Sequence, residues 1–390
     1  MKQIMLCLAA LIVITACSSE KPTAEEIARR VADNYSAHQS ISYDVEYRFK
    51  FFSSDDTNSV DAKCIQIRDP QDSIVNAAIW YGKDPDWDKF YLEGSKFSIQ
   101  HTKKMIYETV CPSEGWLGGN WDDGLIRINF LDPEKIVSAV SDTLHQVAVS
   151  DTAIGGRDFW RIDVDYPDDE DYSEMLRSYF VSKTENVIEK IRFKAKFQGN
   201  YQYNEWNLSN IKFDKYHKEH MAEKLEEAKK LDYKYELYDP KTAAHKPMLG
   251  PGEAAPDFAG ETYPDGRSVH LSDYRGKVVV LDYWYMSCKP CIQAIKEINK
   301  ISDKFAGRDV VVLGLNPHDN ENKHKMPKFL EHNEFKYPII FVDKETPDSY
   351  QVSGYPSFFI IGRDGKIVHS HSGYGEGMHK YLDSIITAAL

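Results

Sequence analysis

The chain has 390 residues, with 48 Lys and Arg residues against 61 Asp and Glu residues and a formal net charge of −13. This length predicts two or three domains with separate apolar cores. The 42% apolar and 28% charged fractions argue against wholesale disorder and against a multi-span membrane protein. The acidic total argues against nucleic-acid binding, because no basic excess is available to neutralise phosphates.

Residues 1–16 have the pattern of a signal peptide. After Lys2, residues 4–14 are uncharged and largely apolar, and as a helix they would reach only about 16 Å, roughly half of a 30 Å bilayer core. The run Ile14-Thr15-Ala16-Cys17 resembles a bacterial lipobox, which implies lipidation of Cys17 and cleavage before it. A plain secretory signal is the alternative. Residues 17–23 are then expected to form a flexible tether.

Cysteine usage follows from this start. Cys7 leaves with the signal peptide and Cys17 carries the lipid, so the remaining cysteines are Cys64, Cys111, Cys288 and Cys291. Outside the cytoplasm thiols can pair. We expect a possible structural disulfide Cys64–Cys111, with two buried thiols as the alternative, and a different role for the other pair.

Residues 24–213 are predicted to form one β-rich domain. Residues 24–38 have the apolar spacing of an amphipathic helix. From residue 41 the apolar period changes to two, and strand-like runs, including one at 89–99, continue to residue 213. The pattern predicts a mostly antiparallel sheet.

A helix followed by a row of Tyr-rich strands resembles the half-barrel domains of the LolA and LppX type. That resemblance implies a concave sheet with an apolar pocket that could hold a lipid or a partner. The alternative is a β-rich scaffold that spaces a catalytic domain from the membrane. Residues 214–247 are rich in charges and helix formers, so we expect a charged helical connector before a second domain at 248–390.

The second domain contains the motif Cys288-Lys289-Pro290-Cys291, which follows a near-continuous apolar run. Such a run predicts a central strand covered on both faces, and the apolar spacing after Cys291 predicts a helix. Cys288 would therefore lie at a helix N-terminus, where the helix dipole and Lys289 favour the thiolate that attacks disulfides. Cys291, one turn on, could resolve a mixed disulfide. Pro290 falls in the first turn, where its missing N–H is not needed.

Half of a zinc site and an incidental pair of cysteines are the alternatives for this motif. The chain has no second C-x-x-C or C-x-x-H to complete a zinc site, and His369 and His371 at i, i+2 are more typical of a surface strand. We therefore expect no metal and no cofactor, and a redox-active disulfide Cys288–Cys291.

The same region resembles the TlpA and ResA group of extracytoplasmic thioredoxin-like proteins. The resemblance is carried by residues 252–258, 265–284, 310–316, 337–343 and 352–367. It implies an α/β thioredoxin fold and a cis-proline at Pro356 facing the cysteines, where the preceding backbone pairs with a substrate strand. The expected substrate groove comprises Pro356, Tyr355, Trp284, Lys289 and Pro290.

Two departures from that group bear on proton transfer. The group often carries a Glu three residues after the second cysteine, and this chain has Ala294 there. Many members have Asn at the position of Asp282, and this Asp instead matches the buried acid of cytoplasmic thioredoxins. We therefore expect Asp282 to take the proton from Cys291, with a pKa raised by burial. A hydrogen-bonded structural acid is the alternative.

Together these features predict a membrane-anchored thiol-disulfide oxidoreductase that acts as a disulfide reductase. Its expected partners are disulfide-bonded extracytoplasmic client proteins, a membrane thiol donor, and the membrane itself through the lipid anchor. Its expected location is the periplasmic side of a bacterial membrane, with the outer membrane preferred. The alternatives are a lipid- or partner-binding lipoprotein with an accessory redox domain, and a peroxiredoxin-like peroxidase. A peroxidase is expected to have Thr three residues before the reactive cysteine, and this chain has Tyr285 at that position.

Overall fold

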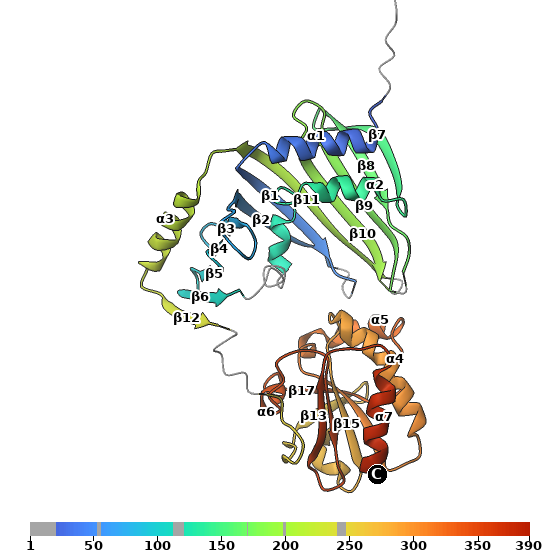
Figure 1. Cartoon of the computed structure of the whole chain (residues 1–390). Helices are drawn as coiled ribbons and strands as arrows, with labels where there is room; N and C mark the ends of the chain where they lie inside the picture. The colour runs from blue at the N-terminus through green and yellow to red at the C-terminus, as the bar shows by residue number, and fades with distance from the viewer. Residues whose placement is uncertain (1–20, 53–55, 112–120, 170, 198–199, 240–246) are drawn as a thin grey trace, which may run out of the picture.

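A computed structural model describes residues 21–52, 56–111, 121–169, 171–197, 200–239 and 247–390. The predicted signal peptide at 1–16, the lipidation site Cys17 and most of the tether lie outside these residues. Two sheets organise the described chain, one in each half of the sequence (Figure 1). Among the described residues, no helix is both long enough and apolar enough to cross a bilayer.

The N-terminal sheet has twelve strands in the order β12-β6-β5-β4-β3-β2-β1-β11-β10-β9-β8-β7. Their bounds are β1 Ser40–Lys50, β2 Asn58–Arg68, β3 Ala77–Lys83, β4 Trp87–Leu92, β5 Ser95–Gln100, β6 Met105–Val110, β7 Gln146–Ile154, β8 Arg157–Asp165, β9 Tyr172–Ser182, β10 Ile188–Phe197, β11 Asn200–Phe213 and β12 Lys234–Tyr238. The predicted run at 89–99 is two strands, because Glu93 and Gly94 both have positive φ and turn the chain between β4 and β5.

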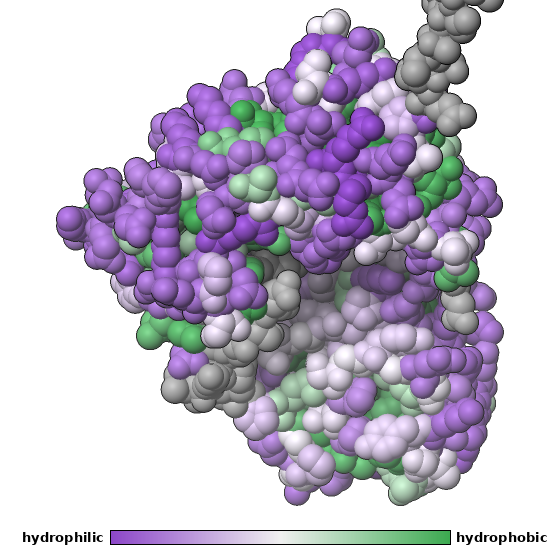
Figure 2. Space-filling view, turned by 45° about the horizontal axis from the view of Figure 1, so that its top comes forward, coloured by the Kyte–Doolittle hydropathy of each residue, from purple (hydrophilic) through white to green (hydrophobic). Residues whose placement is uncertain are grey.

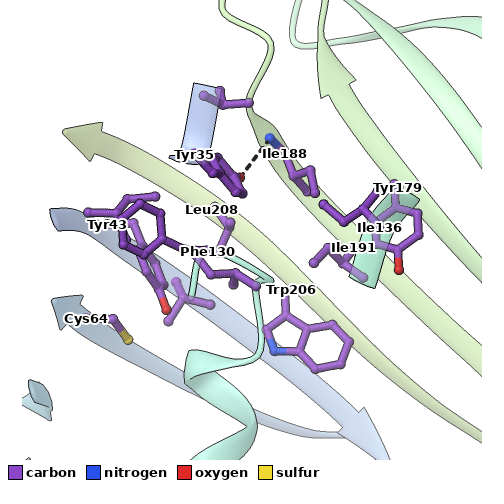
Figure 3. Packing of buried hydrophobic residues seen from close by; sticks show 14 of the residues in the cluster. Tyr35, Tyr43, Cys64, Phe130, Ile136, Tyr179, Ile188, Ile191, Trp206 and Leu208 are labelled. Carbon is purple, nitrogen blue, oxygen red and sulfur yellow. Dashed lines mark hydrogen bonds between the residues drawn. The ribbon is translucent and has the colours of Figure 1, made fainter. Parts of the chain in front are cut away.

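Helix α1 (Ala24–Ser36) covers one face of this sheet together with α2 (Glu134–Ser141) and the 3₁₀ turn η2 (Trp121–Ile126) (Figure 1). Thr23 caps α1 through a capping box with Glu26. Ile27, Val31 and Tyr35 are fully buried against the sheet. The Tyr35 hydroxyl accepts a hydrogen bond of 3.2 Å from the Ile188 backbone N–H, which attaches α1 to the start of β10 (Figure 3).

This sheet is mixed and open. Strands β1 to β6 and β7 to β11 each pair antiparallel in sequence order, and β1 pairs antiparallel with β11 to join the two runs. Strand β12 pairs in parallel with β6, and β12 and β7 form the two edges. The described strands therefore form a large open sheet and not a closed barrel. The likeness to half-barrel domains of the LolA type stays a prediction.

The expected connector at 214–247 differs from the structure. It begins with the helix α3 (Lys218–Lys229), but Met221, Leu225 and Ala228 are buried against the opposite face of the sheet from α1, and β12 then extends the sheet. The charged residues of α3 lie outside the buried stripe of the helix. The segment therefore belongs to the N-terminal domain.

The expected disulfide Cys64–Cys111 is absent, and both residues are buried thiols. Cys64 lies on β2 and Cys111 directly follows β6, with three strands between them. Four inter-strand steps of about 4.8 Å separate the two cysteines by roughly 19 Å, whereas a disulfide requires Cα atoms within about 7 Å. The alternative of two buried thiols holds.

The C-terminal sheet has seven strands in the order β14-β13-β17-β16-β15-β18-β19. Their bounds are β13 Ala259–Tyr263, β14 Ser268–His270, β15 Val278–Tyr283, β16 Val310–Asn316, β17 Ile339–Val342, β18 Ser357–Ile361 and β19 Ile367–Ser372. The central strands β15, β16 and β17 are parallel. Strand β18 pairs antiparallel with β15, and β19 pairs antiparallel with β18.

Helices complete this domain. They are α4 Lys289–Lys304, α5 Met326–Leu330, α6 Thr346–Ser349 and α7 Met378–Ala389, with 3₁₀ turns η3 Leu271–Tyr274 and η4 Asn320–Lys325. Helices α4 and α7 pack on the face of β15 that carries Val278 and Val280. The opposite face, with Val279 and Leu281, packs against Leu271 and Tyr350. This arrangement is a thioredoxin fold, as the sequence resemblance implied.

Candidate active site

The buried strand β15 leads to the two cysteines at the N-terminus of α4. Cys288 is the N-cap residue of α4, with an extended backbone, and its Sγ accepts a hydrogen bond of 3.2 Å from the Cys291 backbone N–H. Pro290 occupies the first turn, where no intrahelical bond needs its N–H. The strand-to-helix transition predicted from the sequence thus places Sγ of Cys288 at the positive end of the helix dipole.

Cys288 and Cys291 are joined by a disulfide, with their Cα atoms 5.2 Å apart. Cys288 is 4% exposed and Cys291 is 1% exposed. After reduction, the N–H that now contacts Sγ of Cys288 would stabilise a thiolate on that atom. The arrangement suits Cys288 as the attacking group and Cys291 as the more deeply buried resolving thiol.

Asp319 fixes the turn that precedes Cys288. Its Oδ2 accepts hydrogen bonds from the Met286 backbone N–H at 2.7 Å and from the Asn316 side-chain amide at 2.8 Å. Asp319 and Asn316 are both buried. Asn316 ends β16 and Asp319 follows it, about 30 positions from the motif, and no local pattern singled them out.

Asp282 lies on the side of β15 that faces α4, because strand side chains alternate and Val280 and Trp284 pack on that side. Its Oδ2 accepts a hydrogen bond of 2.7 Å from the Tyr337 hydroxyl. Oδ1 is buried with no hydrogen-bond partner among the described residues. Burial raises the pKa of Asp282 to about 7, against the lowering effect of the Tyr337 hydrogen bond. A carboxyl group with this pKa can accept and return a proton near neutral pH.

The loop before β18 forms another part of the expected groove. The Tyr355–Pro356 peptide bond is cis, and Pro356 is buried. The Tyr355 ring lies edge-on to the Tyr285 ring at 5.3 Å between centroids and to the His318 ring at 5.0 Å. Tyr285 comes from the turn before Cys288, so this aromatic cluster joins the proline loop to the cysteine motif.

Trp284 does not line the expected groove. Its side chain is fully buried between Phe329 and Phe335, with ring centroids at 5.6 and 4.7 Å. The side-chain alternation that brings Asp282 beneath α4 also turns Trp284 inward. Trp284 therefore supports the cysteine turn from the core and presents no surface to a client, whereas Pro290 is exposed.

The N-terminal domain contacts the motif through residues that sequence reasoning missed. Nζ of Lys289 lies 3.6 Å from Oδ2 of Asp171, 4.3 Å from the Tyr172 ring centroid and 5.6 Å from the Phe197 ring centroid. The Gln293 amide donates a hydrogen bond to Asp171. Phe197 is 1% exposed and belongs to the same apolar cluster as both cysteines. Lys289 of the C-terminal domain thus contacts the N-terminal domain, although more than 100 residues of chain separate it from Asp171.

Comparisons with known proteins agree with this site. Residues 251–370 match the AhpC/TSA family. A thiol-disulfide oxidoreductase ResA of Bacillus cereus is 31% identical over 146 residues, which are 36% of this chain and 82% of that protein. ResA of Bacillus subtilis is 30% identical over 145 residues, which are 36% of this chain and 79% of that protein.

A crystal structure described as a thiol:disulfide interchange protein DsbE from Chlorobium tepidum is 33% identical, covers 36% of this chain and 98% of its own, and has a TM-score of 0.33. The sequence matches to the ResA proteins extend over about four fifths of their length. Through its C-terminal domain, the chain belongs to the family of ResA-type thiol-disulfide oxidoreductases.

Proposed function

We propose that the protein is a disulfide reductase of the bacterial cell envelope, which reduces disulfides of client proteins with the Cys288–Lys289–Pro290–Cys291 motif. The observation that carries the proposal is the Cys288–Cys291 disulfide at the N-terminus of α4. The buried carboxyl of Asp282 lies on the side of β15 that faces this helix.

The reaction starts from the reduced protein. The Cys288 thiolate attacks one sulfur of a client disulfide, which forms a mixed disulfide and releases the other client sulfur as a thiolate that takes up a proton. Asp282 removes the proton from Cys291, and the resulting thiolate attacks Sγ of Cys288. The Cys288–Cys291 disulfide forms and the second client thiol leaves. Two electrons have passed from the dithiol to the client.

The direction of this exchange follows from the environment of the motif. Known C-x-x-C proteins span about −270 to −120 mV, and thioredoxin stands at the reducing end. A buried acid on β15 and a proline before the second cysteine resemble that end. We therefore assign reduction of clients, with a membrane dithiol as the donor that restores the reduced state.

The location is part of the same proposal. The lipobox-like run ending at Cys17 supports lipid anchoring on the periplasmic side of a bacterial membrane, with the outer membrane preferred. Two or three acyl chains, at about 0.8 kcal/mol per buried CH₂, would hold the protein firmly. Residues 17–23 would link the lipid to α1.

The AhpC/TSA match favours a peroxidase as the second candidate. A peroxidase would transfer an oxygen from hydrogen peroxide to Cys288 as a sulfenic acid, which Cys291 would then resolve with loss of water. A peroxidase of this kind is expected to have Thr three residues before its reactive cysteine, and this chain has Tyr285 there. Consumption of hydrogen peroxide by the reduced protein, measured beside disulfide reduction, separates the two.

The test is reduction of a fluorescent disulfide peptide by the purified protein, which is first reduced with dithiothreitol and then freed of it, so that the protein is the sole source of thiols. Cys288→Ser should abolish turnover, Cys291→Ser should stop it after one mixed disulfide, and Cys64→Ala should leave it unchanged, because Cys64 lies in the N-terminal core. Equilibration with glutathione should give a potential near about −270 mV. Turnover by Cys288→Ser, or a potential near about −120 mV, would overturn the assignment.

A further inference from the structure

A large cavity joins the two domains. It measures about 1770 Å³, and it is lined on one side by the sheet face that carries Tyr47, Phe193 and Trp206, and on the other by Tyr285 and Ser287. Tyr285 and Ser287 closely precede Cys288. We call this cavity the interdomain chamber, and Figure 2 shows a hollow between the domains. One end of the interdomain chamber therefore lies beside the redox site.

Arg177 of β9 lines the interdomain chamber. Its Nε is buried and has no hydrogen-bond partner among the described residues, and its guanidinium lies 5.3 Å from the Phe193 ring centroid. In the described chain no carboxylate lies within 4 Å of this guanidinium. Burial lowers the pKa of Arg177, but the neighbouring Tyr179 and Tyr166 hydroxyls raise it more, so the group stays charged.

Tyr179 lies two residues further along β9 and lines the same chamber. Its side chain is 1% exposed, and within the described residues its hydroxyl has no hydrogen-bond partner. Figure 3 shows the ring beside Ile136 and Ile191. A buried hydroxyl without a well-formed hydrogen bond is costly. Here it lies close to the half-buried side chain of Arg177, whose Nε also makes no well-formed hydrogen bond among the described residues.

Other charges of the chamber are already engaged. Asp132 pairs with Lys135 at 3.1 Å, and Asp142 lies 3.8 Å from His145. Arg68 donates to the backbone carbonyls of Leu131 and His38. Arg177 and Tyr179 are thus two lining groups with unused hydrogen-bonding capacity that are set together on one strand.

We propose that the interdomain chamber binds an acidic polypeptide segment of the client, whose Asp or Glu carboxylate is held by Arg177 and Tyr179 while its disulfide meets Cys288. The carboxylate would accept charge-assisted hydrogen bonds from both groups. A volume of about 1770 Å³ exceeds the roughly 300–1,000 Å³ of small-molecule pockets, which favours a polypeptide segment. The inference rests on the proposed function and assigns the N-terminal domain to client selection.

Binding is measured with the Cys288→Ser/Cys291→Ser variant, so that no redox step is needed. The probe is a fluorescent ten-residue peptide with one internal disulfide and two Glu residues, compared by anisotropy with a twin that has Gln at both positions. We expect the Glu peptide to bind about tenfold more tightly, since one strong charge-assisted interaction is worth about that factor.

Arg177→Gln should abolish the difference between the two peptides. Tyr179→Phe removes only the hydroxyl and should reduce the difference between the two peptides about threefold. This variant also provides the test if Arg177→Gln fails to fold. Arg157→Gln is the control, because Arg157 lies on β8, pairs with Glu189 at 2.6 Å and is absent from the chamber lining. It should leave the tenfold preference intact.

Three results would overturn the inference: equal binding of the two peptides, a preference unchanged in Arg177→Gln, or Arg177-dependent binding of decanoate without binding of the peptide. Reduction of the small neutral disulfide hydroxyethyl disulfide by the cysteine-intact protein tests the proposed function separately. Normal reduction without peptide preference refutes only the chamber inference, whereas peptide preference without reduction refutes only the reductase.

Discussion

Asp282 combines deep burial with a single hydrogen bond, and this combination determines its chemistry. Its pKa is raised to about 7 by burial, whereas an Asp in the unfolded chain has a pKa near about 3.9. At a pH between these two pKa values, Asp282 keeps its proton in the folded protein but loses it in the unfolded chain. The free energy of unfolding contributed by this group therefore falls as the pH rises from about 4 to 7, and it levels off above the folded pKa.

Asp282→Asn tests both consequences. We expect kcat for disulfide reduction at pH 7 to fall about 100-fold, because the base for Cys291 is lost, and the inflection near pH 7 in the pH–rate profile to disappear. Urea denaturation measures the second consequence. In the wild type the free energy of unfolding should fall between pH 4.5 and 7.5, and in Asp282→Asn this fall should be smaller by a few kcal/mol, because each unit of pKa shift corresponds to about 1.4 kcal/mol.

Tyr337→Phe provides the matched control for that variant. It removes the hydroxyl that donates to Oδ2, so the pKa of Asp282 should rise further and the inflection should move to higher pH while remaining present. A pH–rate profile that is identical in the wild type and Asp282→Asn would show that Asp282 is only a structural acid.

At the scale of elements, the adjoining ends of β9 and β10 cover the redox site. Tyr172 opens β9 and Phe197 closes β10, and the two residues are paired across the sheet with ring centroids 5.1 Å apart. Phe52 adds a further ring at 4.6 Å from Phe197. Cys288 is buried in the same cluster, so these strand ends limit access to its sulfur.

Phe197→Ala should expose the disulfide. We expect the rate of Cys288–Cys291 reduction by dithiothreitol, followed by mass spectrometry after alkylation, to rise at least fivefold, because the ring that packs over the cluster is removed. Phe180→Ala is the control, since Phe180 is also buried but contacts Arg161 and Lys190 instead of the cysteine cluster. A rate unchanged by Phe197→Ala would contradict a covering role for this edge.

The elements differ in how far the sequence predicts them. The strand into Cys288 and helix α4 are predicted because a buried parallel strand and an amphipathic helix each have a strong local period. Helix α3 is predicted, but its burial is not, since Met221, Leu225 and Ala228 form a narrow apolar stripe in a charged segment. The parallel pairing of β12 with β6 depends on how the chain returns to the sheet, which no local pattern encodes.

At the scale of the molecule, the two domains contribute to one site. The motif, Asp282 and the cis peptide bond before Pro356 lie within 75 residues of sequence, and sequence reasoning singles them out together. Asp171, Phe197 and Arg177 come from the other domain. Their contact with the motif or the interdomain chamber arises from tertiary packing. The sequence therefore predicts only the C-terminal half of the substrate groove that we propose.

We propose that Cys288 is the attacking thiolate and that it meets its client in the interdomain chamber. The direct measurement is mass spectrometry of the mixed disulfide that Cys291→Ser forms with the Glu-containing disulfide peptide, digested and mapped. We expect one adduct, on Cys288, and we expect it to form faster than with the Gln twin. An adduct on Cys64 or Cys111, or no adduct while wild-type protein still reduces the peptide, would contradict this proposal.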